Sequence, residues 1–563
     1  MKIDSFCLIQ MPSEDALFGA VGTRILPLSL GIITGYLRQR GIDVDQFDLL
    51  PLMEEKCGSG IEHSEFERFF DKEAVFNYIN GGDNQFFDEF VQTMLKDINI
   101  AKYDMVALSV GPHLSWVQTF AGLIFGEYIE RHWQKPLVFG GFNLSSMINY
   151  RPIYDELFEV WLKRFPYIII GPGEESLYKL IQALRNNEGD EEIHKINGLC
   201  YLNSSGNLVA NPSEKRRIVM PDFDGLKLKD YYNCIKKDGY DENMISLFRY
   251  PFAFTKPLRN KSEPTEEGYE KTLIIPYIFN YNCPYNCAFC VESDPESPTP
   301  VIAKVEQVIS ELKIIKQKYN TPYFYFINNA VNLSKRYIRE LCNGIIENNL
   351  NIYWSDCARF DNTDYEIIKL MYKAGCRKLV FGMESGSEGL IKRINKKIDL
   401  KQAEQVMSWC NEIGIWPELE IILGMPTEGQ EDFLESYNYL KRNLEKISFM
   451  TINHYIPMPG SEMFRYPEKY NIEVFSDITW EDILTRDLQL FKNGKNPIHY
   501  NNMIKVYNFR EIGQRDSQQI FNDTVEKIKR TKKLMDGKLM QEAMKYVQQG
   551  VIKMSDLQGI QRL

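Results

Sequence analysis

The sequence lacks any apolar run of the length that a transmembrane helix needs, which is about 18 or more residues. The opening segment, MKIDSFCLIQMPSED, lacks the apolar core of a secretory signal. We therefore expect no membrane span and a cytoplasmic location. The net charge is −11 and no basic face is evident, so nucleic acid is not an expected partner.

A disulfide framework is also lacking, because 11 cysteines are spread over 563 residues with no secretory signal. Most of these cysteines fit the pattern of small buried hydrophobic residues. The scattered ones are Cys7, Cys57, Cys200, Cys234, Cys342, Cys357, Cys376 and Cys410. The other three, Cys283, Cys287 and Cys290, are clustered and require a separate explanation.

Two series of alternating strands and helices indicate an α/β protein. Apolar segments predict strands at 4–10, 42–49, 103–110, 136–140 and 167–170, with helices between them. Residues 1–190 should therefore form a doubly wound parallel sheet. A second series predicts strands at 272–279, 322–328, 351–357, 377–383, 417–424 and 449–455. Six such units predict a partial (β/α)6 barrel over 268–464.

The remaining residues divide into two regions. Residues 191–267 contain a predicted hairpin at Gly198–Val209 and a polar connector, and we interpret them as a linker. Residues 465–563 are charged and mostly helical. We expect this tail to help cover the mouth of the barrel and the substrate. Four aromatic residues at its start or along its length are Phe464, Trp480, Tyr500 and Tyr507.

The clustered cysteines have the spacing C-x3-C-x2-C, directly after the first strand of the second series. Cysteines this close can bind three corners of one iron–sulfur cubane and leave one iron free for other chemistry. An electron-transfer ferredoxin needs a fourth nearby cysteine, and none occurs in 291–341. The main alternative, a structural zinc site, would also need a fourth ligand nearby.

This motif resembles the signature of the radical S-adenosylmethionine (SAM) superfamily, with Phe289 as the aromatic residue before the last cysteine. The resemblance implies a 4Fe–4S cluster whose open iron binds SAM. One electron then cleaves SAM to a 5′-deoxyadenosyl radical, which abstracts hydrogen from the substrate. The resemblance also implies an external low-potential electron donor, such as flavodoxin or ferredoxin, and a low-oxygen setting.

Other segments also resemble this family. Phe381–Ser387 resembles its fourth-strand segment, so Gly382, Glu384 and Ser385 are expected near SAM. Ile422 is an expected adenine contact, although Glu420 and Glu428 depart from the usual pattern around it. Asn328 closes the second strand where many members have Gly-Gly-Glu, and Arg359 ends the third. The alternatives are a structural acid at Glu384, a core residue at Ile422 and a solvated Arg359.

Residues 1–190 resemble the cobalamin-binding domain that precedes many radical SAM barrels. Glycine-bearing segments follow the predicted strands, at the sheet edge where α/β folds bind ligands. The familiar Asp-x-His-x-x-Gly motif is absent, so a vestigial domain without corrin stays an alternative. The expected cobalamin contacts are Pro27, Leu28, Ser109, Gly111, Pro112, Gly140, Gly141, Phe142, Gly171, Gly173 and Glu174; His113 is a further candidate to face the corrin.

The domain order resembles cobalamin-dependent radical SAM enzymes, whose largest class is methyltransferases. That resemblance implies two uses of SAM: one to methylate cobalamin, and one to make the radical that activates a carbon of a peptide or small natural product. The alternatives are a rearrangement or cyclisation enzyme, a radical SAM enzyme without corrin, and a non-catalytic Fe–S sensor.

Overall fold

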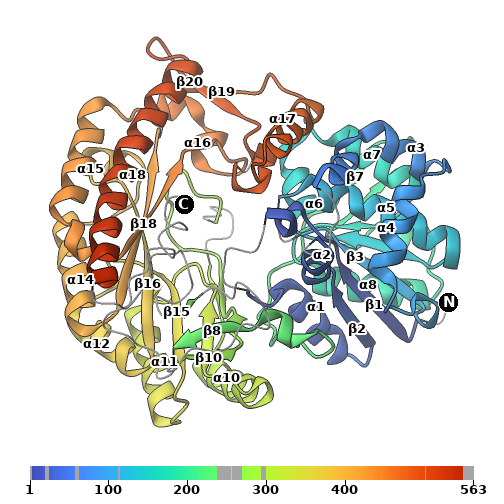
Figure 1. The fold of residues 1–563 in the computed structure, drawn as a ribbon, viewed down its shortest axis with the longest axis horizontal. Helices are drawn as coiled ribbons and strands as arrows, with labels where there is room; N and C mark the ends of the chain where they lie inside the picture. Colours follow the sequence, from blue (N-terminus) through green and yellow to red (C-terminus); the bar gives the residue numbers. More distant parts are fainter. Residues whose placement is uncertain are drawn as a thin grey trace. The chain divides into compact units, whose positions relative to one another are not determined.

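Two parallel sheets organise the chain in the computed structural model (Figure 1). The structure describes residues 3–18, 24–57, 63–111, 114–236, 255–256, 269–292, 299–500 and 502–548. Unit 1 comprises Met1–Ala20, Leu26–Lys227 and Ser476–Val506; unit 2 comprises Val21–Ile25, Leu228–Phe475 and Tyr507–Leu563. Within the described ranges, no helix is both long and apolar enough to cross a membrane.

Unit 1 contains a seven-stranded sheet of order β2-β1-β3-β4-β5-β6-β7. Strands β1 to β5 pair in parallel, which confirms the predicted doubly wound sheet. The predicted hairpin forms as β6 and β7, and β6 joins the edge of this sheet by antiparallel pairing with β5. The strands are β1 Ser5–Gln10, β2 Asp43–Asp48, β3 Met105–Ser109, β4 Leu137–Gly140, β5 Ile168–Ile169, β6 Leu199–Leu202 and β7 Leu208–Ala210.

The helices of unit 1 fall into two groups. Helix α1 (Leu28–Arg38) packs against α8 (Gly173–Arg185), whereas α3 (Lys72–Ile79) and α4 (Gln85–Leu95) pack against α5 (Trp116–Trp133). The strand order reverses between β1 and β3, which is the switch point of a flavodoxin-like sheet. Ligands of such sheets bind beyond the carboxyl ends of the strands at this point.

Unit 1 also contains shorter helices, some of them unpredicted. Helices α6 and α7 between β4 and β5 are additions to the predicted elements. Helix α6 spans only six residues, whereas α7 carries buried apolar residues at helical spacing that sequence reasoning missed. These shorter elements are η1 Glu14–Phe18, α2 Leu50–Cys57, η2 His63–Phe70, η3 Ile100–Lys102, α6 Phe142–Met147, η4 Ile148–Tyr150, α7 Asp155–Arg164 and α9 Asp190–Ile193.

A segment from the tail completes unit 1. Helix α17 (Trp480–Lys492) packs on η2, and the short helices η8 (Pro497–Tyr500) and η9 (Asn502–Ile504) follow it. Trp480 is 2% exposed, and its ring centroid lies 5.9 Å from that of Trp116 and 6.2 Å from that of Phe76. This part of the tail therefore belongs to the hydrophobic core of unit 1.

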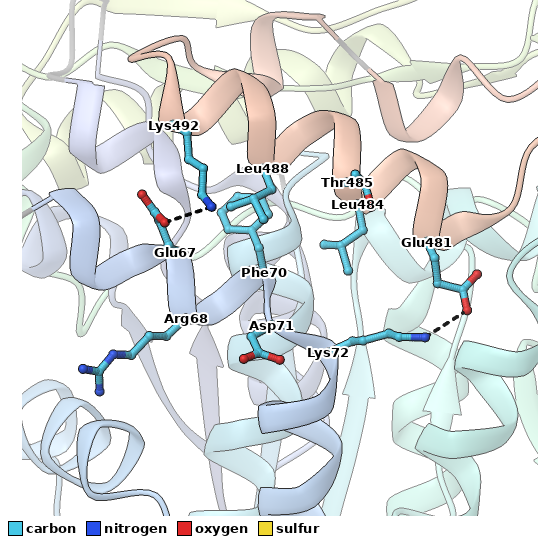
Figure 2. A pocket seen from close by; sticks show the side chains of 10 residues that line it. All are labelled: Glu67, Arg68, Phe70, Asp71, Lys72, Glu481, Leu484, Thr485, Leu488 and Lys492. Atoms are coloured by element: carbon cyan, nitrogen blue, oxygen red, sulfur yellow. Dashed lines mark hydrogen bonds and ion pairs between the residues drawn. The ribbon is translucent and has the colours of Figure 1, made fainter.

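A groove runs between α17 and the η2–α3 segment (Figure 2). Its apolar floor contains Phe70 and Leu484. Two ion pairs cross it, Lys72–Glu481 at 3.3 Å between Nζ and Oε1, and Glu67–Lys492 at 3.4 Å between Oε2 and Nζ. The groove is lined by as many acidic as basic side chains, so it has no net charge to attract an ionic ligand. The two ion pairs therefore serve mainly to hold α17 against η2 and α3.

Unit 2 contains the predicted partial barrel, a six-stranded sheet of order β11-β14-β15-β16-β17-β18 in which every pairing is parallel. Helices alternate with these strands, as predicted. The strands are β11 Ile275–Tyr277, β14 Tyr323–Phe326, β15 Tyr353–Ala358, β16 Cys376–Glu384, β17 Trp416–Leu423 and β18 Phe449–His454. The helices are α10 Val305–Tyr319, α11 Lys335–Glu347, α12 Tyr365–Lys373, α13 Glu388–Arg393, α14 Leu400–Ile413 and α15 Gln430–Arg442.

The long helix α18 (Ser517–Gln548) packs along β18 and α15 (Figure 1). It therefore takes the place of the helix that would follow the sixth strand. Before it, β19 (Ile472–Phe475) pairs antiparallel with β20 (Asn508–Glu511), so the two strands bracket the segment that packs in unit 1. Smaller elements are η5 Leu228–Tyr231, β8 Asn233–Lys236, β9 Thr255–Lys256, β10 Tyr269–Thr272, β12 Asn280–Tyr281, β13 Val301–Ile302, η6 Leu444–Lys446, α16 Glu462–Arg465 and η7 Pro467–Tyr470.

We predict that Trp480→Ala destabilises unit 1 by about 3–5 kcal/mol, because it removes a buried indole and leaves a cavity. Urea unfolding monitored by tryptophan fluorescence and circular dichroism should show an earlier first transition. The matched control is Gln489→Ala on the exposed side of the same helix, which should stay within about 0.5 kcal/mol. An unchanged transition for Trp480→Ala would contradict the assignment of this segment to the core.

Candidate active site

The three clustered cysteines lie on one loop after β11, at the carboxyl end of the first barrel strand. Cys287 is buried, and Cys283 and Cys290 are partly exposed. The loop closes on itself, since the Cys290 N–H donates to the Cys287 carbonyl at 3.0 Å and the Cys283 N–H to the Glu292 carbonyl at 3.3 Å. The loop thus presents three thiols at the mouth of the barrel.

The thiols are close enough to influence one another's ionisation. Burial raises the pKa of Cys290 to about 11, and the Cys287 and Cys283 sulfurs add to the effect. Burial also raises the pKa of Cys283, whereas the guanidinium of Arg359 and the ammonium of Lys396 lower it. Arg359 and Lys396 therefore offset part of the effect of burial on the thiol pKa.

Within the described ranges, no three histidine, cysteine, aspartate or glutamate side chains converge on one point as ligands of a single metal ion. The zinc alternative requires four ligands around one ion, so it has no counterpart there. A cubane differs, because it offers each thiolate a separate iron atom. Three thiols on one loop, with no fourth ligand beside them in the part of the chain that the structure describes, fit a cluster with one open iron.

The turn after α13 holds the cysteine loop in place. The Ala288 N–H donates to the Ile394 carbonyl at 2.9 Å, and Asn395 Nδ2 donates to the Asn286 carbonyl at 2.6 Å. Sequence reasoning missed this turn, because it lies about a hundred residues beyond the cysteines. Its signal was the cation-rich stretch Lys392-Arg393-Ile394-Asn395-Lys396-Lys397 directly after the Glu384 segment.

Glu384 ends β16, as expected, and is 5% exposed. Its Oε1 accepts from Lys396 Nζ at 2.7 Å, and Lys396 Nζ also lies 5.7 Å from the centre of the Phe289 ring. A side chain at Gly382 would place its Cβ 2.6 Å from Glu384 Oε1, so glycine leaves room for this ion pair. Sequence reasoning predicted the acid and missed Lys396.

Ser385 does not face an open cavity. It is 2% exposed, its Oγ lies 2.8 Å from Ser436 Oγ, and it accepts the Ser387 N–H at 3.0 Å. These bonds shape the turn from β16 into α13. Ser385 therefore fixes the backbone beside Glu384.

Arg359 follows β15 and reaches the cysteine loop. Its guanidinium carbon lies 3.4 Å from the centre of the Tyr285 ring, its Nε donates to Asp361 Oδ1 at 2.8 Å, and an NH2 group donates to the Lys396 carbonyl at 3.3 Å. At 9% exposure, Arg359 is not a solvated surface arginine. It connects the third strand, the cysteine loop and the turn after α13.

Asn328 is bound to backbone and to a buried acid. Its Oδ1 accepts the N–H groups of Phe279 and Asn280, both at 2.9 Å, and its Nδ2 donates to Asp356 Oδ2 at 2.6 Å. Burial raises the pKa of Asp356 to about 8, in spite of hydrogen bonds from Asn328 and the Cys357 N–H that favour the carboxylate. Asn328 thus anchors the chain entering the cysteine loop.

Phe289 and Ile422 are both partly buried and pack on the same core cluster, which contains Ala288, Ile394 and Met425. The structure therefore brings these two predicted contacts to one apolar surface beside the cysteines. Glu428 turns inward: it is 1% exposed, its Oε2 accepts the Gly424 N–H at 2.5 Å, and Lys527 of α18 lies 3.6 Å from it. It ties the loop after β17 to α18, which explains its departure from the usual position.

In unit 1, several predicted residues gather at the carboxyl ends of the strands. The Val110 N–H donates to the Gly140 carbonyl at 2.7 Å, and the Ser109 carbonyl accepts the Met11 N–H at 3.0 Å. A Cβ on Gly111 would lie 2.8 Å from the Phe142 nitrogen. Gly141 has a φ of 113°, and its Cβ would lie 2.5 Å from the Val110 carbonyl oxygen. Only glycines permit this close edge.

Phe142 is 54% exposed at this edge, an unusual position for a large apolar ring. Elsewhere in unit 1, four buried side-chain oxygen atoms have no hydrogen-bond partner among the described residues: Ser13 Oγ, Glu14 Oε1, Gln118 Oε1 and Asn143 Oδ1. Burial raises the pKa of Glu14 to about 8. An exposed apolar ring at a glycine-lined sheet edge suits contact with a large flat ligand.

The remaining predicted contacts lie at the starts of α1 and α8, which pack together. The Pro27 carbonyl accepts the Gly31 N–H at 3.1 Å, next to Leu28 at the start of α1. A Cβ on Gly171 would lie 2.6 Å from Ser213 Oγ, and one on Gly173 3.7 Å from Ile169. Glu174 is 6% exposed, and burial raises its pKa. Pro112 and His113 lie outside the described residues.

Residues 277–440 match the family model described as the Radical SAM superfamily. The chain therefore contains a radical SAM domain, whose cofactors are a 4Fe–4S cluster and SAM. The matched residues contain the cysteine loop and β14 to β17.

Three known proteins illustrate what the chain is similar to. It is 22% identical to an uncharacterised methyltransferase of Pyrococcus horikoshii over 86% of this chain and 88% of that protein. It is 21% identical to the anaerobic magnesium-protoporphyrin IX monomethyl ester cyclase of Rubrivivax gelatinosus, over 54% of this chain and 50% of the cyclase. A structure of the radical SAM methyltransferase TsrM from Kitasatospora setae, with cobalamin and a 4Fe–4S cluster bound, has a TM-score of 0.53 at 16% identity, over 85% of this chain and 82% of TsrM. The structural likeness shows that the two proteins share a fold.

We predict that Asn328→Ala lowers the iron content of the reconstituted protein, because two buried N–H groups lose their acceptor at about 1–3 kcal/mol each. Iron and sulfide analysis and the electron paramagnetic resonance signal of the reduced cluster measure the effect. Asn348→Ala, at the exposed end of α11, is the matched control and should bind iron normally. Full iron content with an unaltered signal in Asn328→Ala would rule out an anchoring role.

Proposed function

We propose that this protein is a cobalamin-dependent radical SAM methyltransferase that acts on an unactivated carbon of a peptide or small natural product. The observation that carries the proposal is the pairing of two sites in one chain. One is a three-thiol loop beside a buried acid–lysine pair at the mouth of a partial barrel; the other is a glycine-lined edge of a flavodoxin-like sheet.

Cys283, Cys287 and Cys290 are the proposed ligands of the cluster. The adjacent side chains suit the two charged groups of the methionine part of SAM: Glu384 for the ammonium, and Arg359 or Lys396 for the carboxylate. Phe289 and Ile422 offer an apolar surface for the adenine ring. When bound, the cluster and SAM supply a 5′-deoxyadenosyl radical, and cobalamin supplies the methyl group.

Cobalamin fits the N-terminal sheet edge on the observations of this structure. Gly111, Gly141 and Gly171 let the loops at the strand ends pack closely on neighbouring protein atoms, and Phe142 offers an exposed ring there. A low-oxygen setting follows from the oxygen sensitivity of an open cluster.

A ring-forming reaction is the second candidate, and the similarity to the Rubrivivax gelatinosus cyclase favours it. It would use the same cluster and SAM site, and its product would gain no methyl group. The isotope content of the product distinguishes the two reactions, since SAM labelled in its methyl group labels only a methylated product.

We predict that replacing Cys283, Cys287 and Cys290 together with alanine abolishes the absorbance of the reconstituted cluster. Each alanine removes one thiolate ligand of iron. Cys342→Ala, a buried cysteine of α11, serves as the control and should keep the cluster. A cluster that survives in the triple variant would overturn the proposed ligand set.

The function itself is tested by anaerobic reconstitution with iron, sulfide and hydroxocobalamin, followed by SAM and dithionite. We expect a corrin spectrum that survives desalting and formation of both 5′-deoxyadenosine and S-adenosylhomocysteine. Gly141→Val should retain far less corrin, because its side chain would meet the Val110 carbonyl, while its iron content stays unchanged. Formation of 5′-deoxyadenosine without retained corrin would refute cobalamin-dependent methyl transfer and leave hydrogen abstraction.

A further inference from the structure

The turn that holds the cysteine loop has a second, outward side. Between Glu388 and Asp399 the chain carries four cations and no anion, in a protein whose net charge is −11. Lys396 points inward and is paired with Glu384. Lys392, Arg393 and Lys397 are exposed, and we call these three residues the cationic turn.

The charge of the cationic turn is only partly compensated. Arg393 NH2 pairs with Asp432 Oδ2 at 2.6 Å, and the Arg393 side chain remains 41% exposed. Neither Lys392 nor Lys397 makes an ion pair or side-chain hydrogen bond with any residue that the structure describes. Both side chains are exposed, so among the described residues nothing covers these two ammonium groups.

The backbone of the same turn is bonded to the cysteine loop. The Ile394 carbonyl accepts the N–H of Ala288, which is the residue after Cys287, at 2.9 Å. Asn395 Nδ2 adds a second bond, to the Asn286 carbonyl at 2.6 Å. An electron that arrives at the outer side of the turn can therefore follow the backbone to Ile394 and cross one hydrogen bond to Ala288. From Ala288 the backbone leads directly to Cys287.

We propose that the cationic turn is the docking surface for an acidic low-potential electron-transfer protein of the flavodoxin type. The docked flavin hydroquinone loses one electron, and the oxidised cluster gains it through the Ile394–Ala288 hydrogen bond. The overall charge of −11 repels an acidic donor, and a local positive surface beside the cluster offsets that repulsion and orients the encounter. This inference rests on the proposed cluster ligands.

Charge reversal of the turn provides the test. Lys392→Glu/Lys397→Glu is compared with Lys313→Glu/Lys369→Glu, which changes the net charge equally on the exposed sides of α10 and α12. The reconstituted holoenzyme is mixed anaerobically with reduced flavodoxin, and the rate of cluster bleaching is followed at low and high salt. Binding of oxidised flavodoxin is measured by calorimetry as a readout that requires no electron transfer.

We expect the turn variant to accept electrons from flavodoxin about tenfold or more slowly at low salt, with a weaker salt dependence and a similarly raised Kd. The control variant should stay within about twofold of the native rate. Reduced methyl viologen, a small cation, should reduce both variants at the native rate. An unchanged flavodoxin rate in the turn variant would overturn the proposal, and so would an equal loss with methyl viologen.

These outcomes also separate the docking surface from the proposed function. If flavodoxin reduces the cluster in a manner that depends on Lys392 and Lys397, yet neither SAM cleavage nor methyl transfer occurs, the docking surface stands and the proposed function fails. If methyl transfer occurs and the charge reversal has no effect on the flavodoxin rate, the function stands and the docking surface fails.

Discussion

The hydrogen bonds between the turn after α13 and the cysteine loop are the constraint on which the rest of the site depends. A loop that must place three thiols around one cluster has little regular structure of its own, so its shape has to be fixed from outside. Ile394 and Asn395 supply that support from one side, and Asn328 fixes the entering chain from the other. Lys396 extends the same turn inward to Glu384, which makes one short segment responsible for the loop and the acid together.

The strands and the major helices could be predicted because their signals are local. Buried parallel strands show as short apolar runs bounded by glycine or polar residues, and all six barrel strands and the five parallel strands of unit 1 formed where those runs occur. The cysteine motif is equally local. Helix α6 went unpredicted because six residues are too few to show a helical period, whereas α7 was missed although Leu157, Phe158, Trp161 and Leu162 follow one.

The site was predicted less completely, since its remaining parts depend on contacts between residues far apart in the sequence. Glu384 could be identified by its place at a strand end, but its partner Lys396 follows a helix and a turn whose geometry no residue pattern specifies. Asn328 was expected near SAM because of its strand position; its side-chain atoms instead bind Asp356 and two backbone N–H groups, and whether it also contacts SAM stays a prediction. Glu428 shows the same limit, because its orientation follows from Lys527, a residue in the last described helix.

The excursion of the chain between β19 and β20 has a consequence for synthesis in the cell. Unit 1 takes Ser476–Val506 into its core, although those residues emerge from the ribosome long after Lys227. At ordinary elongation rates this delay is on the order of tens of seconds. During that time the surfaces that Trp480 and Phe491 later cover remain open to other apolar chains. Nascent unit 1 is therefore a natural client for chaperones, and a ribosome that stalls within the barrel would release an incomplete, aggregation-prone domain.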